Sequence, residues 1–325
     1  MQSAQSFCCG LWPRHKSAWG ERRRYAPALA ALVMAVIILL FTGQAGAAVC
    51  EIVVVQSSEI RPFQEALEGF EETSGCSIKE VMAVQPGIPD LSSIVRRLRP
   101  DAVLALGLDA VIRLQQIRDI PVFFTMAANL PENIRAGDNV SGVSMIVEPE
   151  RQIEALKLVL PNIRRAGVIF NVARSRNFID RLIQAGRRHH VEIIATPAKS
   201  PQDVLHLLSE LKGRADAIMM LPDLTLITQE TVNAMLLFSF NHSIPLVSFS
   251  EKFAGMGALA AITIIPRDIG RQTGEMAREY FRDRIAYKNR RSYARKNEIF
   301  INWTVARKLG IGIRDELLKK SMKVE

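Results

Sequence analysis

The feature that most constrains the fold of this chain is a sequence unit that occurs twice, at residues 101–129 and 216–250. Each copy contains an apolar run, a turn, an amphipathic helix, an Ile-Pro step and a second apolar run, and each opens on an aspartate, Asp101 or Asp216. Near-continuous apolar runs joined through a helix are typical of buried parallel strands in a β-α-β unit. The repeat therefore predicts two similar α/β lobes that offer their strand ends to a shared cleft.

The rest of the chain continues this alternation of short apolar runs and amphipathic helices. With 325 residues the chain is long enough for two domains with separate cores. The predicted fold class is α/β, with two doubly wound parallel-sheet lobes joined by a hinge, a strand that first crosses between them at 139–145, and two short helices at the end. The expected boundaries are 49–143 with 264–286 for the N-terminal lobe, 144–263 with 297–325 for the C-terminal lobe, and 287–296 for a basic connector.

The positive charge of the chain lies at its two ends. The formal net charge is +9, but residues 49–281 hold 24 basic and 27 acidic side chains. No basic stripe runs along the predicted core elements, which argues against binding to nucleic acid.

The N-terminus has the pattern of a secretory signal peptide. Arg22, Arg23 and Arg24 precede an apolar segment at 26–41, and small residues follow up to Ala48. This segment is shorter than the roughly 20 apolar residues of a membrane-spanning helix, so an uncleaved anchor is the less favoured alternative. We expect residues 1–48 to be a leader and signal peptide, cleavage after Ala47 or Ala48, and a periplasmic mature protein.

The predicted mature chain retains two cysteines, Cys50 and Cys76, one at the start of each of the first two predicted strands. Adjacent parallel strands bring their starts together, and exported proteins keep disulfides. A Cys50–Cys76 disulfide is therefore expected, with two free, half-buried thiols as the alternative.

Several segments, in the same order, resemble a known family. PDAVLALGLDA is similar to the family's strand and Gly-x-x-Ala turn, and DIPVFF to its next strand. NVSGVS, LPNIRRAGVIFN, PRDIGRQTGEMA and IFINWTVARKLGIGI are similar to later motifs, so that the resemblance covers residues 50–325. The family is that of the substrate-binding proteins of ABC importers with the type I periplasmic-binding fold, in the subgroup associated with tryptophan- and tyrosine-type amino-acid uptake.

The resemblance implies a protein that captures an amino acid or similar ligand between its lobes and delivers it to an ABC permease. It implies no enzyme activity, no cofactor, no metal and, as we expect, a monomer. A periplasmic sensor that presents its ligand to a membrane receptor is the alternative. An enzyme is disfavoured because the first strand-helix turn lacks phosphate-binding glycines and no nucleophile motif is present. A ligand-responsive repressor is disfavoured because the chain has an export signal and no helix-turn-helix.

In such folds ligands bind beyond the carboxyl ends of the parallel strands, where helix N-termini offer free N–H groups. This rule gives twelve candidate ligand-binding residues: Ser57, Ser58, Gly107, Leu108, Asp109, Thr125 and Met126 in the first lobe, and Asn171, Ser175, Asp223, Ser250 and Glu251 in the second. The chain departs from the family's pattern at Leu108-Asp109, at 126–129 and at Leu224.

Most of these residues also have a plain structural interpretation. Asp109 opens its own helix, where an aspartate is more often a cap than a ligand, and for Asp223 a cap of the next helix and a ligand contact are equally open. A carboxylate ligand suits the amides at 108–110 or Arg174, and an ammonium suits Asp223 or Glu251. The five histidines show no metal-ligand spacing.

Overall fold

The computed structural model describes residues 50–84, 90–128, 130, 134, 139–223, 225–284, 290–314, 317 and 321–324. The predicted signal peptide at 1–48 and part of the predicted connector at 287–296 lie outside the described residues. Residues Ala48–Glu325 form one compact unit, which contains two β-sheets.

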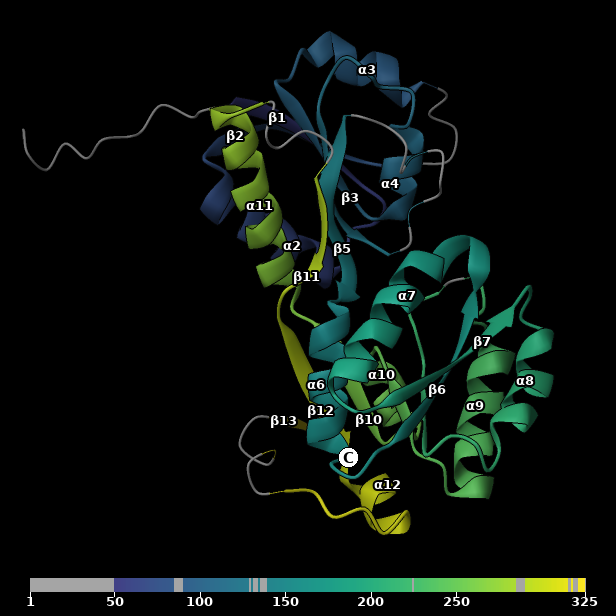
Figure 1. The fold of residues 1–325 in the computed structure, drawn as a ribbon. Helices are drawn as coiled ribbons and strands as arrows, with labels where there is room; N and C mark the ends of the chain where they lie inside the picture. Colours follow the sequence, from purple (N-terminus) through teal and green to yellow (C-terminus); the bar gives the residue numbers. More distant parts are fainter. Residues whose placement is uncertain are drawn as a thin grey trace, which may run out of the picture. The chain divides into compact units, whose positions relative to one another are not determined.

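The first sheet, with the helices that cover it, forms what we call the first lobe (Figure 1). Its described strands are all parallel and follow the order β11-β5-β4-β3-β1-β2. The strands are β1 (Cys50–Gln56), β2 (Cys76–Ala83), β3 (Ala102–Leu106), β4 (Val122–Ala127), β5 (Val140–Val147) and β11 (Arg291–Ala294). The helices are α2 (Arg61–Ser74), α3 (Leu91–Leu98), α4 (Leu108–Arg113) and α11 (Pro266–Arg282).

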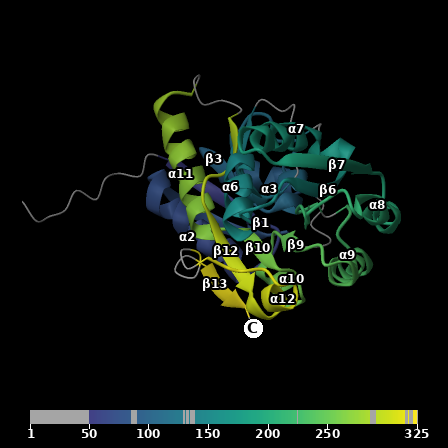
Figure 2. The same ribbon diagram turned by 60° about the horizontal axis from the view of Figure 1, so that its bottom comes forward.

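The second sheet and its helices form the second lobe, with the strand order β13-β12-β10-β9-β8-β6-β7 among the described residues. Only the β10–β12 pair in this order is antiparallel, and Figure 2 shows β12 and β13 beyond β10. The strands are β6 (Arg165–Asn171), β7 (Glu192–Ala198), β8 (Ala217–Met219), β9 (Leu246–Ser248), β10 (Ala260–Ile264), β12 (Asn297–Asn302) and β13 (Ser321–Val324). The helices are α6 (Pro149–Val159), α7 (Val172–Arg188), α8 (Asp203–Leu211), α9 (Gln229–His242), α10 (Glu251–Gly255) and α12 (Trp303–Lys308).

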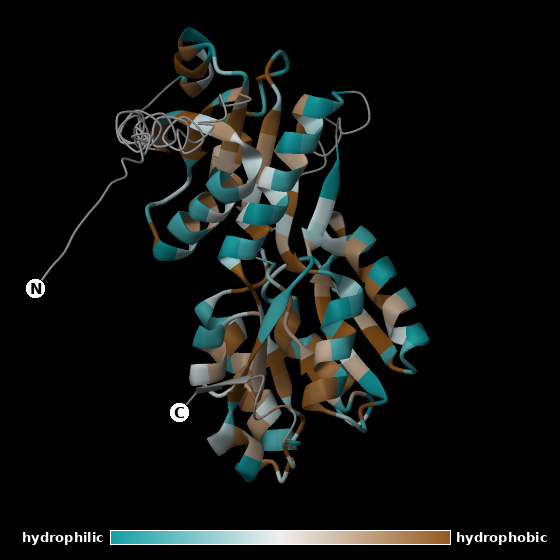
Figure 3. Cartoon of the chain, turned by 90° about the vertical axis from the view of Figure 1, so that its left-hand side faces the viewer, coloured by the Kyte–Doolittle hydropathy of each residue, from teal (hydrophilic) through white to brown (hydrophobic). Residues whose placement is uncertain are grey.

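The sheets form because their central strands are apolar on both faces. Every residue of β3 is buried: Val103 and Ala105 belong to one hydrophobic cluster, and Ala102, Leu104 and Leu106 to the other. Figure 3 shows hydrophobic residues concentrated along the strands and hydrophilic residues on the outer sides of the helices. Helices on both faces are what such strands require.

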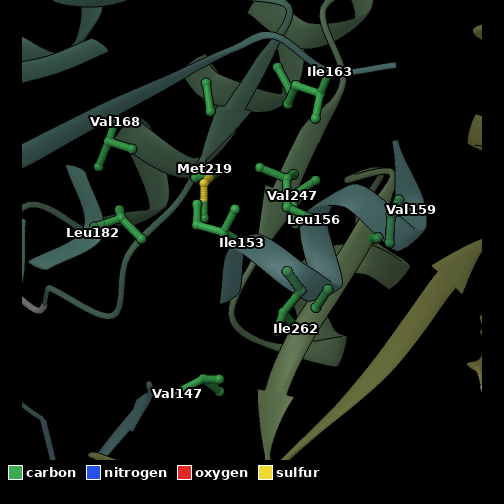
Figure 4. Close-up of a cluster of buried hydrophobic side chains, with 14 of the residues drawn as sticks. Val147, Ile153, Leu156, Val159, Ile163, Val168, Leu182, Met219, Val247 and Ile262 are labelled. Carbon is green, nitrogen blue, oxygen red and sulfur yellow. The ribbon is translucent and has the colours of Figure 1, made fainter. Parts of the chain in front are cut away.

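The core of the second lobe is built on α6 (Figure 4). The fully buried side chains of Ile153 and Leu156 on this helix cluster with Met219 of β8, Val247 of β9 and Ile262 of β10. Burial of each of these large apolar side chains contributes roughly 1.5–3 kcal/mol. The helix that follows the first crossing is thereby fixed to the second sheet.

The predicted repeat is confirmed by the topology, since both lobes begin with the same order: β2-β1-β3-β4-β5 and β7-β6-β8-β9-β10. The two aspartates that open the repeats, Asp101 and Asp216, make equivalent hydrogen bonds. The Asp101 carboxylate accepts the backbone N–H of Glu51 at 2.8 Å, and the Asp216 carboxylate accepts that of Arg165 at 2.8 Å. Each aspartate thus ties the start of the third strand of its lobe to the start of the first.

The two cysteines are paired. Cys50 and Cys76 lie opposite each other in the β1–β2 register, with their Cα atoms 4.6 Å apart, and their sulfur atoms form a disulfide.

Two expectations about the lobe boundaries need correction. Strand β5 extends to Val147, so residues 144–147 belong to the first sheet. Within the expected connector, Arg291–Ala294 form β11, the edge strand of the first sheet, because they pair with the buried strand β5. At the C-terminus, the expected helices are represented among the described residues by α12 and by the helical Leu317, and Ser321–Val324 add the strand β13 beside β12, which was not predicted.

Candidate functional site

The topology brings the carboxyl ends of both sheets to the same region. The chain leaves the carboxyl end of β5 for α6 in the second lobe, and the carboxyl end of β10 for α11 in the first. The strands β1, β3 and β4 are parallel to β5, and β6, β8 and β9 are parallel to β10. The carboxyl ends of all these strands therefore lie at the end of each sheet from which the chain crosses to the other lobe. This is where ligands bind in doubly wound sheets.

A cavity of about 420 Å³ lies between the two lobes. Its volume falls in the range of roughly 300–1,000 Å³ that small-molecule sites occupy. Its walls come from β4, β5, β11 and the chain after β4 on one side, and from α7 on the other. The lining residues are Phe124, Ala128, Leu130, Ser144, Arg291, Ser292 and Tyr293 from the first lobe, and Arg174, Asn177, Phe178, Asp180 and Arg181 from the second.

Helix α7 presents one face to this cavity. Arg174, Asn177, Phe178 and Arg181 have the spacing i, i+3, i+4, i+7, which places their side chains on one side of a helix. The Phe178 ring meets the ring of Tyr293 edge to face at 5.5 Å between centroids, and the Arg181 guanidinium lies 5.7 Å from the Tyr293 centroid. Tyr293 belongs to β11, so these contacts join the lobes across the cavity.

The arginines of the cavity differ in how they are engaged. The Arg291 guanidinium donates to the backbone carbonyls of Val140 and Ile134, at 3.2 and 3.0 Å. Within the described ranges, Arg174 has no hydrogen-bond or ion-pair partner, although its side chain is half-buried. Arg174 is therefore the cation best placed to meet an anionic group of a ligand.

The predicted residues around α4 lie elsewhere in the first lobe. The Ser57 hydroxyl accepts the backbone N–H of Ala110 at 2.9 Å, so this hydroxyl caps the turn into α4. Gly107 has a φ of 91°, and a Cβ there would lie 2.6 Å from the Ser57 oxygen. Ser57 and the exposed Asp109 line a separate cavity of about 330 Å³. Their sequence neighbours Ser58 and Leu108 are half-buried.

Thr125 and Met126 flank the cavity without lining it. Thr125 is completely buried, and within the described part of the chain its hydroxyl has no hydrogen-bond partner. Met126 is buried with a φ of 56°, which is uncommon for a residue other than glycine. The cavity is lined instead by Phe124 of β4 and by Ala128, which follows the strand.

Asp223 is the centre of a hydrogen-bond network at the strand ends of the second lobe. Its carboxylate is buried and accepts from the backbone N–H of Asn171 and the Ser175 hydroxyl, each at 3.4 Å. It also accepts from the backbone N–H and the hydroxyl of Thr225, at 3.0 and 2.6 Å. Asn171 caps α7 by accepting the N–H of Ala173 at 3.0 Å.

The alternative role of Asp223 as the cap of the next helix is corrected by the structure. Thr228 caps α9 instead, since its hydroxyl accepts the backbone N–H of Thr231 at 3.3 Å in a capping box. Asp223 lies five residues earlier and holds two strand-end loops together.

Ser250 and Glu251 begin the short helix α10, which the sequence did not predict. Glu251 is exposed, and its carboxylate and that of Glu65 of α2 both act on the carboxylate of Glu298 in β12. Burial raises the pKa of Glu298 above its ordinary value of 4.5, and the charges of Glu65 and Glu251 raise it further. An added acidic ligand group is disfavoured at this place.

None of the twelve predicted ligand-binding residues lines the 420 Å³ cavity, although several lie one or two residues from its wall. Of the α7 face, only Arg174 was expected to meet a ligand; the i, i+3, i+4, i+7 spacing of Arg174, Asn177, Phe178 and Arg181 is the signal that identifies the rest. Tyr293 carries no such signal, because the basic and polar sequence around it predicts a connector.

Two doubly wound lobes with a cavity between them define a two-lobed solute-binding protein. A model of the family described as ABC transporter substrate binding protein matches residues 63–325, and the chain belongs to this family. Its fold is the type I periplasmic-binding fold.

Individual relatives are distant. A tyrosine-binding protein from Clostridioides difficile is 24% identical over 230 residues, which cover 67% of this chain and 66% of that protein. The chain thus spans just under two thirds of the length of this relative.

Two solved structures share the fold. A structure from Streptococcus pneumonia in complex with L-Trp has a TM-score of 0.59 at 18% identity and covers 85% of this chain and 99% of that chain. The ligand-free, open structure of a substrate-binding protein with adhesive properties from Clostridium difficile has a TM-score of 0.62 at 20% identity, with the same coverage.

No helix in the described part of the chain has the length and hydropathy needed to cross a membrane. Among the same residues, no group of three or more histidine, cysteine or acidic side chains is placed to hold a metal ion.

Proposed function

We propose that this protein captures a small aromatic compound with a carboxylate group, an amino acid or a similar ligand, and delivers it to an ABC permease. The observation that carries the proposal is the cavity between the lobes, where three aromatic rings, those of Phe124, Phe178 and Tyr293, accompany the half-buried Arg174. Aromatic walls favour a flat apolar body, and a guanidinium favours a carboxylate. The tyrosine and tryptophan bound by relatives are compounds of this kind.

Ligand binding is tested by isothermal titration calorimetry of the purified protein against phenylalanine, tyrosine, tryptophan, their deamino acids, leucine and a sugar. We expect the aromatic compounds to bind and leucine and the sugar to bind weakly or not at all. Tyr293→Ala removes one wall of the cavity, and we expect it to raise the dissociation constant about tenfold, which corresponds to roughly 1.4 kcal/mol. Phe240→Ala is the matched control, because Phe240 is an exposed ring on α9 outside this cavity. Equal binding by wild type and Tyr293→Ala, or no binding by any aromatic compound, contradicts the proposal.

Export and a monomeric state belong to the same proposal. The support for export is the charge and apolar pattern of residues 1–48 together with the Cys50–Cys76 disulfide, a bond that persists in oxidising compartments. N-terminal sequencing of the protein after expression in a Gram-negative host is expected to find a start at Ala48 or Val49. A product that retains its first 47 residues in the cytoplasmic fraction contradicts export.

A further inference from the structure

We propose that the cavity selects an aromatic carboxylate that lacks an α-ammonium group over the corresponding amino acid. This inference rests on the proposed function and specifies its ligand. It follows from the charges on the cavity wall, which fit an anion with an apolar body and offer little to a cation.

The face that α7 turns to the cavity is cationic. Arg174 and Arg181 lie at its two ends, about 10 Å apart along the axis at 1.5 Å per residue, with Asn177 and Phe178 between them. All four side chains offer a donor or an apolar surface, and the only acceptor among them is the uncharged amide oxygen of Asn177. Arg174 lies in the first turn of α7, where the helix dipole also favours an anion.

The one carboxylate among the described lining residues, Asp180, is poorly placed for an ammonium group. It lies six residues after Arg174, which at about 100° per residue turns it some 120° away from Arg174 around the helix. Asp180 is exposed to solvent. An α-amino acid needs its two charges met by partners a few ångströms apart, and these two side chains do not meet that condition.

The other polar groups of the wall are already engaged. The Ser144 hydroxyl donates to the carbonyl of Ala128 at 3.2 Å, and the Ser292 hydroxyl accepts from Gln272 at 3.0 Å. Asp223, a buried carboxylate bonded to Asn171 and Ser175 at the start of α7, accepts four hydrogen bonds and does not line the cavity. An ammonium group would therefore lose water without a charged partner, which is costly.

The test compares pairs of ligands that differ only in the ammonium group: phenylalanine with 3-phenylpropionate, tyrosine with 3-(4-hydroxyphenyl)propionate, and tryptophan with indole-3-propionate. In calorimetry at pH 7 we expect the acid of the best pair to bind at least tenfold more tightly than its amino acid. Tighter binding of the amino acid overturns the inference and leaves the proposed function intact. Failure of all six compounds to bind contradicts the proposed function itself, and the inference falls with it.

Variants on α7 separate the contributions. Arg174→Ala is expected to weaken binding of the acid by tenfold or more, whereas Arg176→Ala, an exposed arginine of the same helix outside the cavity, keeps wild-type affinity. Asp180→Asn removes a negative charge from the wall and is expected to tighten binding of the acid. If Asp180→Asn instead weakens binding of the amino acid while Arg174→Ala leaves the acid unaffected, the charge argument is wrong.

Discussion

Single aspartates determine how the strand ends of this protein are held. Asp101 and Asp216 each connect the starts of two strands. Asp223 connects two loops at the carboxyl ends of strands in the second sheet. These side chains are polar residues with a structural task. A sequence does not reveal this, because a buried carboxylate with four backbone and hydroxyl partners has the same residue type as one that meets a ligand.

Asp223→Asn is expected to destabilise the protein without direct loss of a ligand contact. The amide group replaces one accepting oxygen by a donor, so two of the four present donors lose their acceptor. We expect the free energy of unfolding to fall by about 1–3 kcal/mol, measured by urea denaturation. The control is Asp109→Asn, which changes an exposed aspartate in the first turn of α4. Unchanged stability combined with abolished binding would instead identify Asp223 as a ligand-binding residue.

At the scale of elements, the closest contact in the first lobe joins α2 and α11, which run side by side in Figures 1 and 2. Small residues permit this approach. A Cβ on Gly270 would clash with the carbonyl oxygen of Ala66, and one on Gly274 would lie 2.6 Å from that of Phe70. Arg267 adds an ion pair with Glu68 at 3.1 Å across the same contact.

Gly270→Ala is expected to separate these two helices and to destabilise the protein. The obstructing atom is backbone, which cannot rotate away, so a cost at or above the roughly 1–3 kcal/mol of an overpacked core is expected. Thermal unfolding of the variant measures the effect. Gly312→Ala is the control, since a Cβ at Gly312 meets no atom within 4 Å. Similar melting temperatures for both variants would mean that the helices adjust freely.

The elements themselves were largely predictable from sequence. Apolar runs such as Ala102–Leu106 agree with the observed strand, because a strand buried on both faces has a continuous apolar signal. Short or partly polar elements were not predictable in this way. The strand Arg291–Ala294 is rich in polar residues and lies at a sheet edge, and its pairing with β5 depends on a segment about 150 residues earlier. The lining of the 420 Å³ cavity was not predictable for a related reason, because part of its wall comes from α7 and part from this edge strand.

At the scale of the whole domain, the two lobes are joined by three short crossings among the described residues, at 147–149, 264–266 and 294–297. The third crossing is fastened to the first lobe. Arg295 forms an ion pair with Glu275 at 2.6 Å, and Lys296 forms one with the buried Asp268 at 2.7 Å. Because both carboxylates belong to α11, relative movement of the lobes is expected to bend the chain after Lys296.

Ligand binding is expected to draw the lobes together, because a compound that touches both α7 and β11 gains contacts only when these walls approach. A ligand shifts such an equilibrium by its difference in affinity for the two arrangements. Small-angle scattering at saturating concentration of the tightest ligand found by calorimetry is expected to show a smaller radius of gyration. Arg174→Ala at the same ligand concentration is expected to show a smaller decrease, in proportion to its lower occupancy. A wild-type curve that does not change when calorimetry shows full occupancy would mean that the cavity is already formed before the ligand arrives, and that the crossings act as fixed struts between the lobes.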